Sequence, residues 1–207
     1  MNTRYTASGT QGQTEPGSDG AVLANKLHIT RPDEIEEVEL LLLEQLYESV
    51  LALNLPARSI VVGDLVGWHR QWLGNVYPWA GELRGVNASK GGFTFAVATQ
   101  VPRLLMEFER DCLARYTPAV GNGPTVLAEA IAITHAELIL IHPFVEGNGR
   151  LARLLADVMA AQAGRPPLDY SAWDADRERY FAAIRAAMGR DYAAMRELVE
   201  RALMPAE

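Results

Sequence analysis

Hydrophobic residues recur every three or four positions along most of this chain, which is the spacing of helices with one buried face. In the stretch 34–50, for example, Ile35, Val38, Leu42 and Leu46 fall on one such face. The same periodicity predicts further helices over residues 61–72, 101–116, 126–141, 149–163, 172–188 and 192–203. We therefore expect a chain that is helical over most of its length.

Two short segments break the helical pattern. Before the first helix, Thr30 or Asp33 is the expected cap, since a side-chain oxygen at this position accepts a hydrogen bond from an unpaired backbone amide. Between the second and third helices, the pair Gly91-Gly92 is flanked by Val86 and by the apolar stretch 93–97, a pattern typical of a β-hairpin. One small hairpin is therefore expected among the helices.

Composition sets the domain organisation. The chain has 207 residues, of which 49% are hydrophobic, enough for one domain of ordinary size with its own core. Residues 1–19 are rich in Gly, Ser, Thr and Gln, which predicts a flexible tail, and residues 20–207 are assigned to a single domain. Cys112 is the only cysteine, so no internal disulfide can form.

Charge and hydropathy argue against two classes of partner. The net charge is -7, from 19 basic and 26 acidic residues, and no run of Lys or Arg offers the basic face that nucleic-acid binding needs. No uncharged apolar stretch reaches the roughly 18 to 20 residues of a membrane-spanning helix, and the N-terminus has no apolar segment of the signal-peptide kind. We expect a cytoplasmic protein that binds neither nucleic acid nor membrane directly.

One segment, HPFVEGNGRLAR at residues 142–153, carries most of the candidate chemistry. It follows an apolar helical run and leads into another, so it forms a loop and a helix N-terminus. Such an N-terminus presents unpaired backbone amides and the positive end of the helix dipole. Gly147, Asn148 and Gly149 could therefore bring amides against an anion.

Arg150 and Arg153 supply the stronger part of this predicted anion site. The helix dipole contributes roughly 0.3 to 1 kcal/mol per anionic group, whereas a hydrogen bond to a charged group contributes about 1.5 to 3 kcal/mol. The two arginines are three residues apart, so they rise from one helical face and could grip successive phosphates. A diphosphate or triphosphate suits this pair best.

Glu146 and His142 add chemistry to the anion site. A carboxylate beside bound phosphates is best explained by Mg²⁺ between them, so we interpret Glu146 as a metal ligand. His142, four residues earlier, can take a proton near neutral pH and is the candidate base for a hydroxyl nucleophile. Together these residues predict transfer of a phosphorus-containing group from a magnesium-bound nucleotide to an alcohol.

The segment resembles, at every defining position, the Fic motif HxFx(D/E)GNGRxxR. Residues 20–27, GAVLANKL, are similar to the N-terminal segment of many small Fic proteins. Residues 76–84, VYPWAGELR, and 87–93, NASKGGF, resemble the region that leads into their target-binding flap. The resemblance covers about residues 20–203.

The resemblance implies an enzyme that transfers AMP from ATP to a Ser, Thr or Tyr hydroxyl of a target protein. It implies the all-α Fic fold, a helical bundle around the loop and helix of residues 142–153 with a small β-hairpin flap. His142 would deprotonate the acceptor, Glu146 would hold Mg²⁺ between the α and β phosphates, and Phe144 would anchor the loop.

The resemblance also assigns the residues that hold the nucleotide. They come from the loop and the start of the following helix, namely Gly147, Asn148, Gly149, Arg150 and Arg153. The first three would form an anion hole, and the two arginines would hold the β and γ phosphates. In the related Doc toxin, lysine replaces the second glycine and the nucleotide is reversed for phosphorylation, so Gly149 favours adenylylation.

The predicted hairpin would present the acceptor. Lys90, Gly91, Gly92 and Phe93 are expected to pair main chain to main chain with the acceptor segment. Other chemistries on the same motif remain alternatives: transfer of another nucleotide, of phosphocholine or of phosphate, or removal of AMP. A non-catalytic binding module is disfavoured because His142 is intact.

Many Fic proteins are inhibited by a helix with the motif (S/T)xxxE(G/N), whose Glu pairs with the second arginine, here Arg153. Thr30 and Thr125 each have a glutamate four residues later, Glu34 and Glu129, but Ile35 and Ala130 stand where the motif needs Gly or Asn. We therefore expect the toxin half of a toxin–antitoxin pair, inhibited by a separate small antitoxin carrying that helix. Similar toxins modify ATPase subunits of type II topoisomerases, which are candidate targets.

The other histidines receive no catalytic role from the sequence. His135 and His142 would lie roughly 10.5 Å apart along a helix, too far to share one ion. His135 is therefore expected to be a packed or hydrogen-bonded helix residue. His69, beside Trp68 and Trp72, is expected to be structural, and His28 is given no role.

Overall fold

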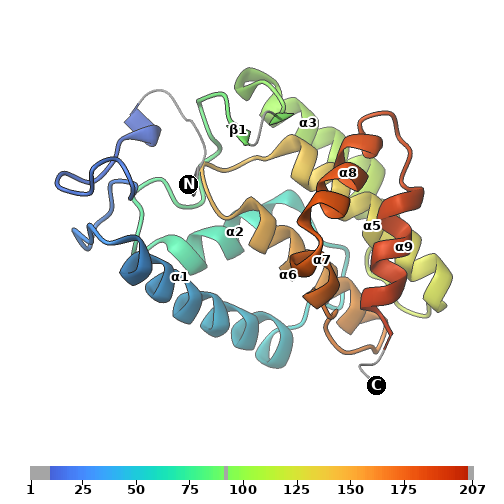
Figure 1. The fold of residues 1–207 in the computed structure, drawn as a ribbon. Coiled ribbons are helices and arrows are strands. Elements are labelled where there is room, and N and C mark those ends of the chain that lie inside the picture. The colour runs from blue at the N-terminus through green and yellow to red at the C-terminus, as the bar shows by residue number, and fades with distance from the viewer. Residues whose placement is uncertain (1–9, 91–92, 205–207) are drawn as a thin grey trace.

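The computed structural model describes residues 10–90 and 93–204, which form a helical bundle with a two-stranded hairpin at its edge (Figure 1). The α-helices are α1 (Pro32–Tyr47), α2 (Val62–Leu73), α3 (Val101–Phe108), α4 (Ala114–Tyr116), α5 (Pro124–Ile141), α6 (Asn148–Gln162), α7 (Ser171–Ala175), α8 (Arg177–Ala187) and α9 (Ala193–Ala202). Short 3-10 helices span Thr10–Gly12 and Ala98–Gln100, and π-helical turns span Glu48–Leu53 and Glu109–Leu113. The all-α prediction is confirmed.

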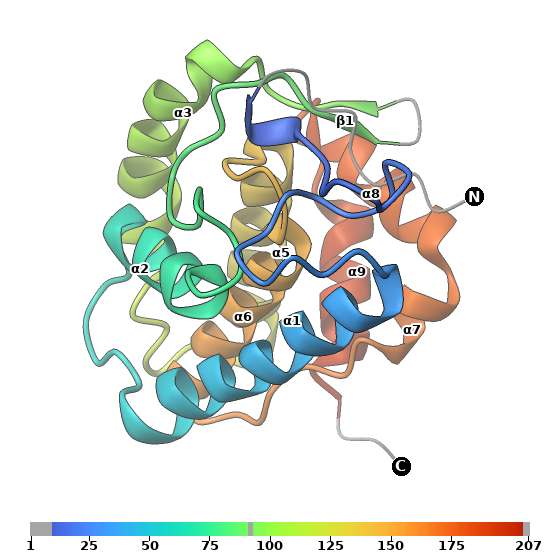
Figure 2. The same cartoon turned by 90° about the vertical axis from the view of Figure 1, so that its left-hand side faces the viewer.

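The centre of the bundle is α5, which packs against α3, α6, α8 and α9 (Figure 2). Most of the surface of α5 is buried, because neighbouring helices cover it on several sides. Its buried residues are mainly alanine and branched apolar residues. By length and composition this helix could also cross a membrane, but 61% of it is buried inside the protein. That burial is typical of a core helix.

The ends of α1 differ from the prediction. Neither Thr30 nor Asp33 caps the helix: Arg31 is the N-cap residue and forms no side-chain cap. Pro32 at the start removes one amide that a cap would have satisfied, and Asp33 instead forms an ion pair with Arg31 at 2.5 Å. The predicted cap was therefore wrong.

The helix predicted over residues 172–188 is divided into α7 and α8. Asp176 leaves the helical conformation, with φ −124° and ψ 71°. Its side chain then caps α8 by accepting a hydrogen bond from the Arg179 amide at 3.0 Å. A cap inside an otherwise helical pattern thus separates two helices.

Residues 10–19 also differ from the expected tail, whereas residues 1–9 lie outside the described part of the chain. Thr14 forms a β-bridge with Leu23. Gln11 accepts a hydrogen bond from the Gly85 amide at 2.8 Å, and Glu15 is buried and accepts one from the Asn25 amide at 2.9 Å. The prediction considered only apolar content, but polar contacts hold this segment against the domain.

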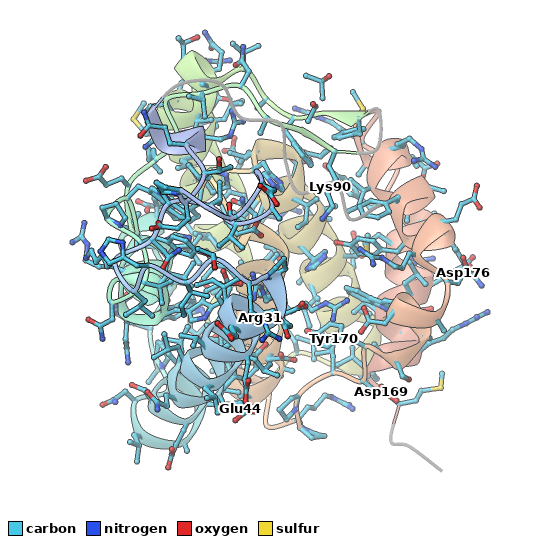
Figure 3. All side chains as sticks on the ribbon, turned by 60° about the vertical axis from the view of Figure 1, so that its left-hand side comes forward. Arg31, Glu44, Lys90, Asp169, Tyr170 and Asp176 are labelled. Carbon is cyan, nitrogen blue, oxygen red and sulfur yellow. The ribbon has the colours of Figure 1, made fainter. Side chains whose placement is uncertain are left out.

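The predicted hairpin is present. Strand β1 (Ser89–Lys90) pairs antiparallel with β2 (Phe93–Thr94), with Lys90 opposite Phe93. Gly91 and Gly92 lie outside the described residues. Figure 3 labels Lys90 of the hairpin and Tyr170 of the connection between α6 and α7. The two residues lie at opposite ends of the space between α1 and the C-terminal helices.

Candidate active site

The loop between α5 and α6 has two residues in left-handed backbone conformations. His142 ends α5 with φ 52°, and Gly147 precedes α6 with φ 82°. A Cβ atom on Gly147 would lie 2.7 Å from the ring of Trp72, so both the conformation and the space require glycine. The predicted loop and helix N-terminus are therefore confirmed.

Asn148 closes this loop with its side chain. Its Oδ1 accepts a hydrogen bond from the Phe144 amide at 2.9 Å, and its Nδ2 donates to the Phe144 carbonyl at 2.8 Å. The residue is 1% exposed. Its side chain therefore shapes the loop, and its backbone amide lies at the first turn of α6.

The backbone amides at that turn remain candidates for anion binding. The helical hydrogen-bond ladder of α6 begins with the Leu151 amide donating to the Gly147 carbonyl at 2.9 Å. The amides of residues 148–150 precede this ladder and lie at the positive end of the helix dipole. The Gly147 amide instead donates to the Glu146 carboxylate at 3.0 Å. The Gly147 amide therefore already has a partner, whereas the amides at the start of α6 remain candidates for the predicted anion site.

His69 supports the loop from α2. It is fully buried and stacks on Phe144 with 3.9 Å between ring centroids. Its Nδ1 accepts a hydrogen bond from the Gly81 amide at 2.8 Å, so its Nε2 carries the proton and donates to the Glu146 carbonyl at 3.1 Å. Burial lowers the pKa of His69 to about 4, which keeps it neutral. The structural role expected for His69 is confirmed.

His142 is held in one tautomer. Its Nδ1 donates to the Ile139 carbonyl at 3.2 Å, so Nε2 is the nitrogen that lacks a proton. The ring stacks on Phe95 with 3.6 Å between centroids. Burial lowers the pKa of His142 to about 3, and the charges of Arg84 and Lys90 act in the same direction. His142 is therefore neutral near pH 7.

Arg84 fastens this loop to the hairpin region. The residue is 2% exposed, and its guanidinium donates to the carbonyls of His142 at 2.5 Å, Ile141 at 3.2 Å and Val86 at 2.7 Å, and also to the Ala96 carbonyl. Burial lowers the pKa of Arg84, because the charge is removed from water. One side chain therefore connects the end of α5 to both sides of the hairpin.

A cavity of about 460 Å³ brings most of the predicted site residues together. Its lining includes His142, Glu146, Gly147, Gly149, Arg150, Arg153 and, from the hairpin, Lys90. Asn148 is absent from this lining among the described residues, because its side chain faces the loop. Phe93 lines a smaller adjoining cavity of about 90 Å³. The predicted base, carboxylate and arginines therefore share one site.

The two arginines of the site have different partners. Arg150 donates to Glu39 of α1 at 2.8 Å and lies over the Trp72 ring, with 4.6 Å from its guanidinium carbon to the centroid. Arg153 forms two hydrogen bonds with Asp174 of α7, at 2.6 and 3.1 Å. Both arginines are therefore paired with carboxylates, one on each side of the cavity.

His135 lies outside the cavity, in the core between α5 and α8. Its Nδ1 donates to the Ala152 carbonyl at 3.2 Å, so its Nε2 accepts from the Tyr180 hydroxyl at 2.9 Å. Burial lowers the pKa of His135 to about 4. The prediction of a packed, hydrogen-bonded helix residue is confirmed.

Glu146 is the residue of this site best suited to hold a metal. Its carboxylate lines the cavity and lies 3.7 Å from Arg150. Within residues 10–90 and 93–204, no group of three or more His, Cys, Asp or Glu side chains could hold a metal by itself. A single carboxylate completed by substrate phosphates and water is nevertheless a usual arrangement for Mg²⁺. The residues present therefore fit that ion.

Glu39, Arg84 and Asp174 are parts of this site that the sequence pattern did not predict. One signal was available for Glu39, because it falls on the apolar stripe of α1 between Ile35 and Leu46, where a carboxylate must find a partner. For Arg84, the only available signal was its place in the Fic-like segment 76–84. For Asp174, nothing in the local pattern distinguishes it from an ordinary acidic residue in a first helical turn.

The fold and site together define a helical protein with a cavity at a helix N-terminus that is lined by a histidine, carboxylates and arginines. Residues 59–160 match the Fic/DOC family. The chain is 30% identical over 152 residues to "Protein adenylyltransferase Fic" of Nematostella vectensis, covering 72% of this chain and 34% of that protein. With the intact motif, these findings show that the chain belongs to the Fic/DOC family.

Solved structures show the same fold. The N-terminal Fic domain of a Bartonella effector protein from Bartonella sp. AR 15-3 has a TM-score of 0.75 at 24% identity, covering 91% of this chain and 89% of that chain. The BepC protein of Bartonella tribocorum, with bound AMPPNP, has a TM-score of 0.72 at 22% identity, covering 89% and 93%. The chain spans only 24% to 34% of the length of the first curated relatives it matches.

Proposed function

We propose that this chain is a protein adenylyltransferase that moves AMP from magnesium-bound ATP to a Ser, Thr or Tyr hydroxyl of a target protein. The proposal rests above all on one observation: a single cavity joins His142, Glu146 and the pair Arg150 and Arg153. The name of the Nematostella vectensis relative and the AMPPNP bound to BepC support the same reaction and the same donor.

The start of α6 would bind the phosphates. Its first amides and Gly149 would contact the chain of phosphates, and Arg150 and Arg153 would hold the β and γ phosphates by charge-assisted hydrogen bonds. A Cβ atom on Gly149 would meet nothing within 4 Å, so this glycine leaves open space at the helix start. The lack of a side chain there supports adenylyl transfer over the phosphorylation associated with lysine.

His142 would move the proton. Its Nε2, which lacks a proton in this tautomer, would take the proton of the acceptor hydroxyl while that oxygen attacks the α phosphorus. The bond from the α phosphorus to the bridging oxygen would break, and pyrophosphate would leave. A bound polyphosphate places negative charge near the ring, which raises the pKa of His142 from its low value and makes it a stronger base.

Glu146 would hold Mg²⁺ against the α and β phosphates. The ion would supply positive charge that neutralises the phosphates as charge develops on the leaving group. The carboxylate is already fixed by the Gly147 amide at 3.0 Å. This fixed position would orient the nucleotide before the reaction.

The hairpin would present the acceptor segment. Strand β2 and the flap residues Lys90, Gly91, Gly92 and Phe93 would pair main chain to main chain with the target, so that the hydroxyl reaches His142. Arg84 supports this arrangement, because it connects the hairpin region to the carbonyl of His142 at 2.5 Å. A type II topoisomerase ATPase subunit is our candidate target.

We further propose that the chain is the toxin of a toxin–antitoxin pair and acts in the cytoplasm, where ATP is supplied. The absence of an (S/T)xxxE(G/N) match in the sequence supports a separate antitoxin carrying that helix. Expression with and without a candidate antitoxin gene tests this. Growth arrest that the antitoxin relieves and that His142→Ala abolishes would support the pair, and growth unaffected by the active chain alone would refute it.

Label transfer from ATP tests the reaction itself. A bacterial lysate is incubated with the chain, Mg²⁺ and ATP labelled either at the α or at the γ phosphorus, with His142→Ala as the matched control. We expect protein labelling from the α position only, lost in the variant. Labelling from the γ position only would show phosphorylation and refute the proposal.

A further inference from the structure

We propose that Glu39 is a positioning residue that holds Arg150 in the orientation needed to bind the nucleotide phosphates. This inference rests on the proposed nucleotide site, and it assigns a role to a helix that lies outside the segment matching the Fic/DOC family. Glu39 and Arg150 are separated by 111 residues in the chain and meet through one hydrogen bond of 2.8 Å.

The side chain of Glu39 is buried in the core. Its side chain is 1% exposed, and both carboxylate oxygens have partners. Oε1 accepts a hydrogen bond from the Tyr77 hydroxyl at 2.5 Å, and Oε2 accepts from Nη2 of Arg150 at 2.8 Å. Its backbone carbonyl accepts from Nε1 of Trp72 at 2.8 Å. A carboxylate held in this way cannot swing into solvent without leaving buried polar groups unpaired.

These contacts fix the plane of the Arg150 guanidinium. One edge bonds to Glu39, and one face lies over the ring of Trp72, 4.6 Å from its centroid. The side chain remains 31% exposed and lines the cavity. A guanidinium has five N–H donors, so its bond to Glu39 leaves donors for a ligand. Arg150 is therefore oriented before the nucleotide arrives, which reduces the entropy lost on binding.

Another carboxylate that lines the cavity, that of Asp174, provides a contrast. Asp174 bonds to Arg153 at 2.6 Å, but its side chain is 61% exposed. A solvent-exposed ion pair is weak, and a phosphate can displace the carboxylate. Asp174 therefore competes with the ligand, whereas Glu39 stays bonded to Arg150 when the ligand binds. Burial gives the two acidic residues opposite effects on affinity.

Binding of magnesium and AMPPNP, measured by titration calorimetry, tests the role of Glu39. Glu39→Gln turns an amide toward Nη2 of Arg150, so we expect the Kd to rise about tenfold, the low end for loss of a hydrogen bond to a charged group. Glu37→Gln is the matched control, because Glu37 is an exposed glutamate of the same helix that is not among the described residues lining the cavity. It should leave the Kd within about twofold.

A milder variant guards against loss of the fold. Tyr77→Phe keeps the charge pair but removes the hydroxyl that fixes Glu39, and we expect a rise in Kd of about threefold in a variant that still unfolds in one cooperative transition. In the labelling reaction, both variants should raise the KM for ATP more than they lower kcat. Binding by Glu39→Gln as tight as, or tighter than, that of the parent would overturn the proposal and mark Glu39 as a competitor of the phosphates.

A double-mutant cycle tests whether Glu39 acts through Arg150. In an Arg150→Ala background, Glu39→Gln should change the Kd no further, and an undiminished tenfold effect there would overturn the proposal. Failure of the proposed reaction has a different signature. A parent chain that binds AMPPNP but labels no protein would refute adenylyl transfer and leave the binding comparison intact.

Discussion

Gly147→Ala is the substitution whose cost follows most directly from the structure. Gly147 has φ 82°, in the left-handed region that non-glycine residues adopt at a cost of about 1 to 2 kcal/mol. An added Cβ would also lie 2.7 Å from the Trp72 ring, and overpacking of this kind costs about 1 to 3 kcal/mol. We therefore expect a loss of about 3 kcal/mol in the free energy of unfolding.

Gly149→Ala is the matched control two residues away. At this helical position a Cβ meets nothing within 4 Å, and alanine favours a helix over glycine by about 1 kcal/mol. The variant should therefore unfold at the same temperature as the parent or slightly above it. Its methyl group projects into the proposed phosphate space, so its affinity for magnesium and AMPPNP should fall.

Thermal unfolding followed by tryptophan fluorescence compares the two variants. For a chain of this size, a loss of about 3 kcal/mol lowers Tm by about 6 to 12 °C. Urea titration gives the corresponding change in free energy. If Gly147→Ala unfolds at the same temperature as Gly149→Ala, the argument from backbone conformation and from the Trp72 contact is refuted.

Three further substitutions test other parts of the structure. Asp174→Asn should lower the Kd for magnesium and AMPPNP by about two- to fivefold, because it frees Arg153 from an exposed ion pair, and a weaker affinity would contradict this. Arg84→Lys should lower the free energy of urea unfolding by about 2 kcal/mol or more, since an ammonium cannot reach all four carbonyls, and an unchanged value would contradict this. Burial raises the pKa of Asp157 to about 6. Its protonated form therefore stabilises the fold fully at pH values below the ordinary pKa of Asp, and this contribution to stability is lost as the pH rises through about 6. The free energy of unfolding of Asp157→Asn should therefore rise relative to that of the parent by about 3 kcal/mol between pH 4 and pH 7. If urea titrations give a difference between the two proteins that does not change with pH, the assignment is contradicted.

The sequence predicted the parts of the site that depend on local spacing. The loop at residues 142–147 and the paired Arg150 and Arg153 follow from a glycine-rich segment that enters an amphipathic helix. The helix positions were predicted for the same reason, apart from the break at Asp176, where a side-chain cap interrupts a helical pattern. Periodicity indicates which residues face the core, but it does not show where a cap divides a helix.

The partners of the site arginines could not be predicted, because they depend on how distant helices pack. Glu39 reaches Arg150 across 111 residues of sequence. Asn148 is another example. An asparagine suits an anion site, but only the structure shows that its side-chain amide forms hydrogen bonds with the Phe144 backbone. The segment 10–19 was misjudged because polar contacts, such as that between Gln11 and Gly85, leave no hydrophobic signature.

The products of the reaction test adenylyl transfer most directly. Magnesium-bound ATP is incubated with the chain and a purified acceptor, and the nucleotides and phosphates released are separated by chromatography, with His142→Ala as the blank. The proposed function predicts one pyrophosphate for each AMP attached to the acceptor and no product above the blank in the variant. Release of ADP in step with acceptor modification would show that the γ phosphoryl group is transferred, and would contradict it.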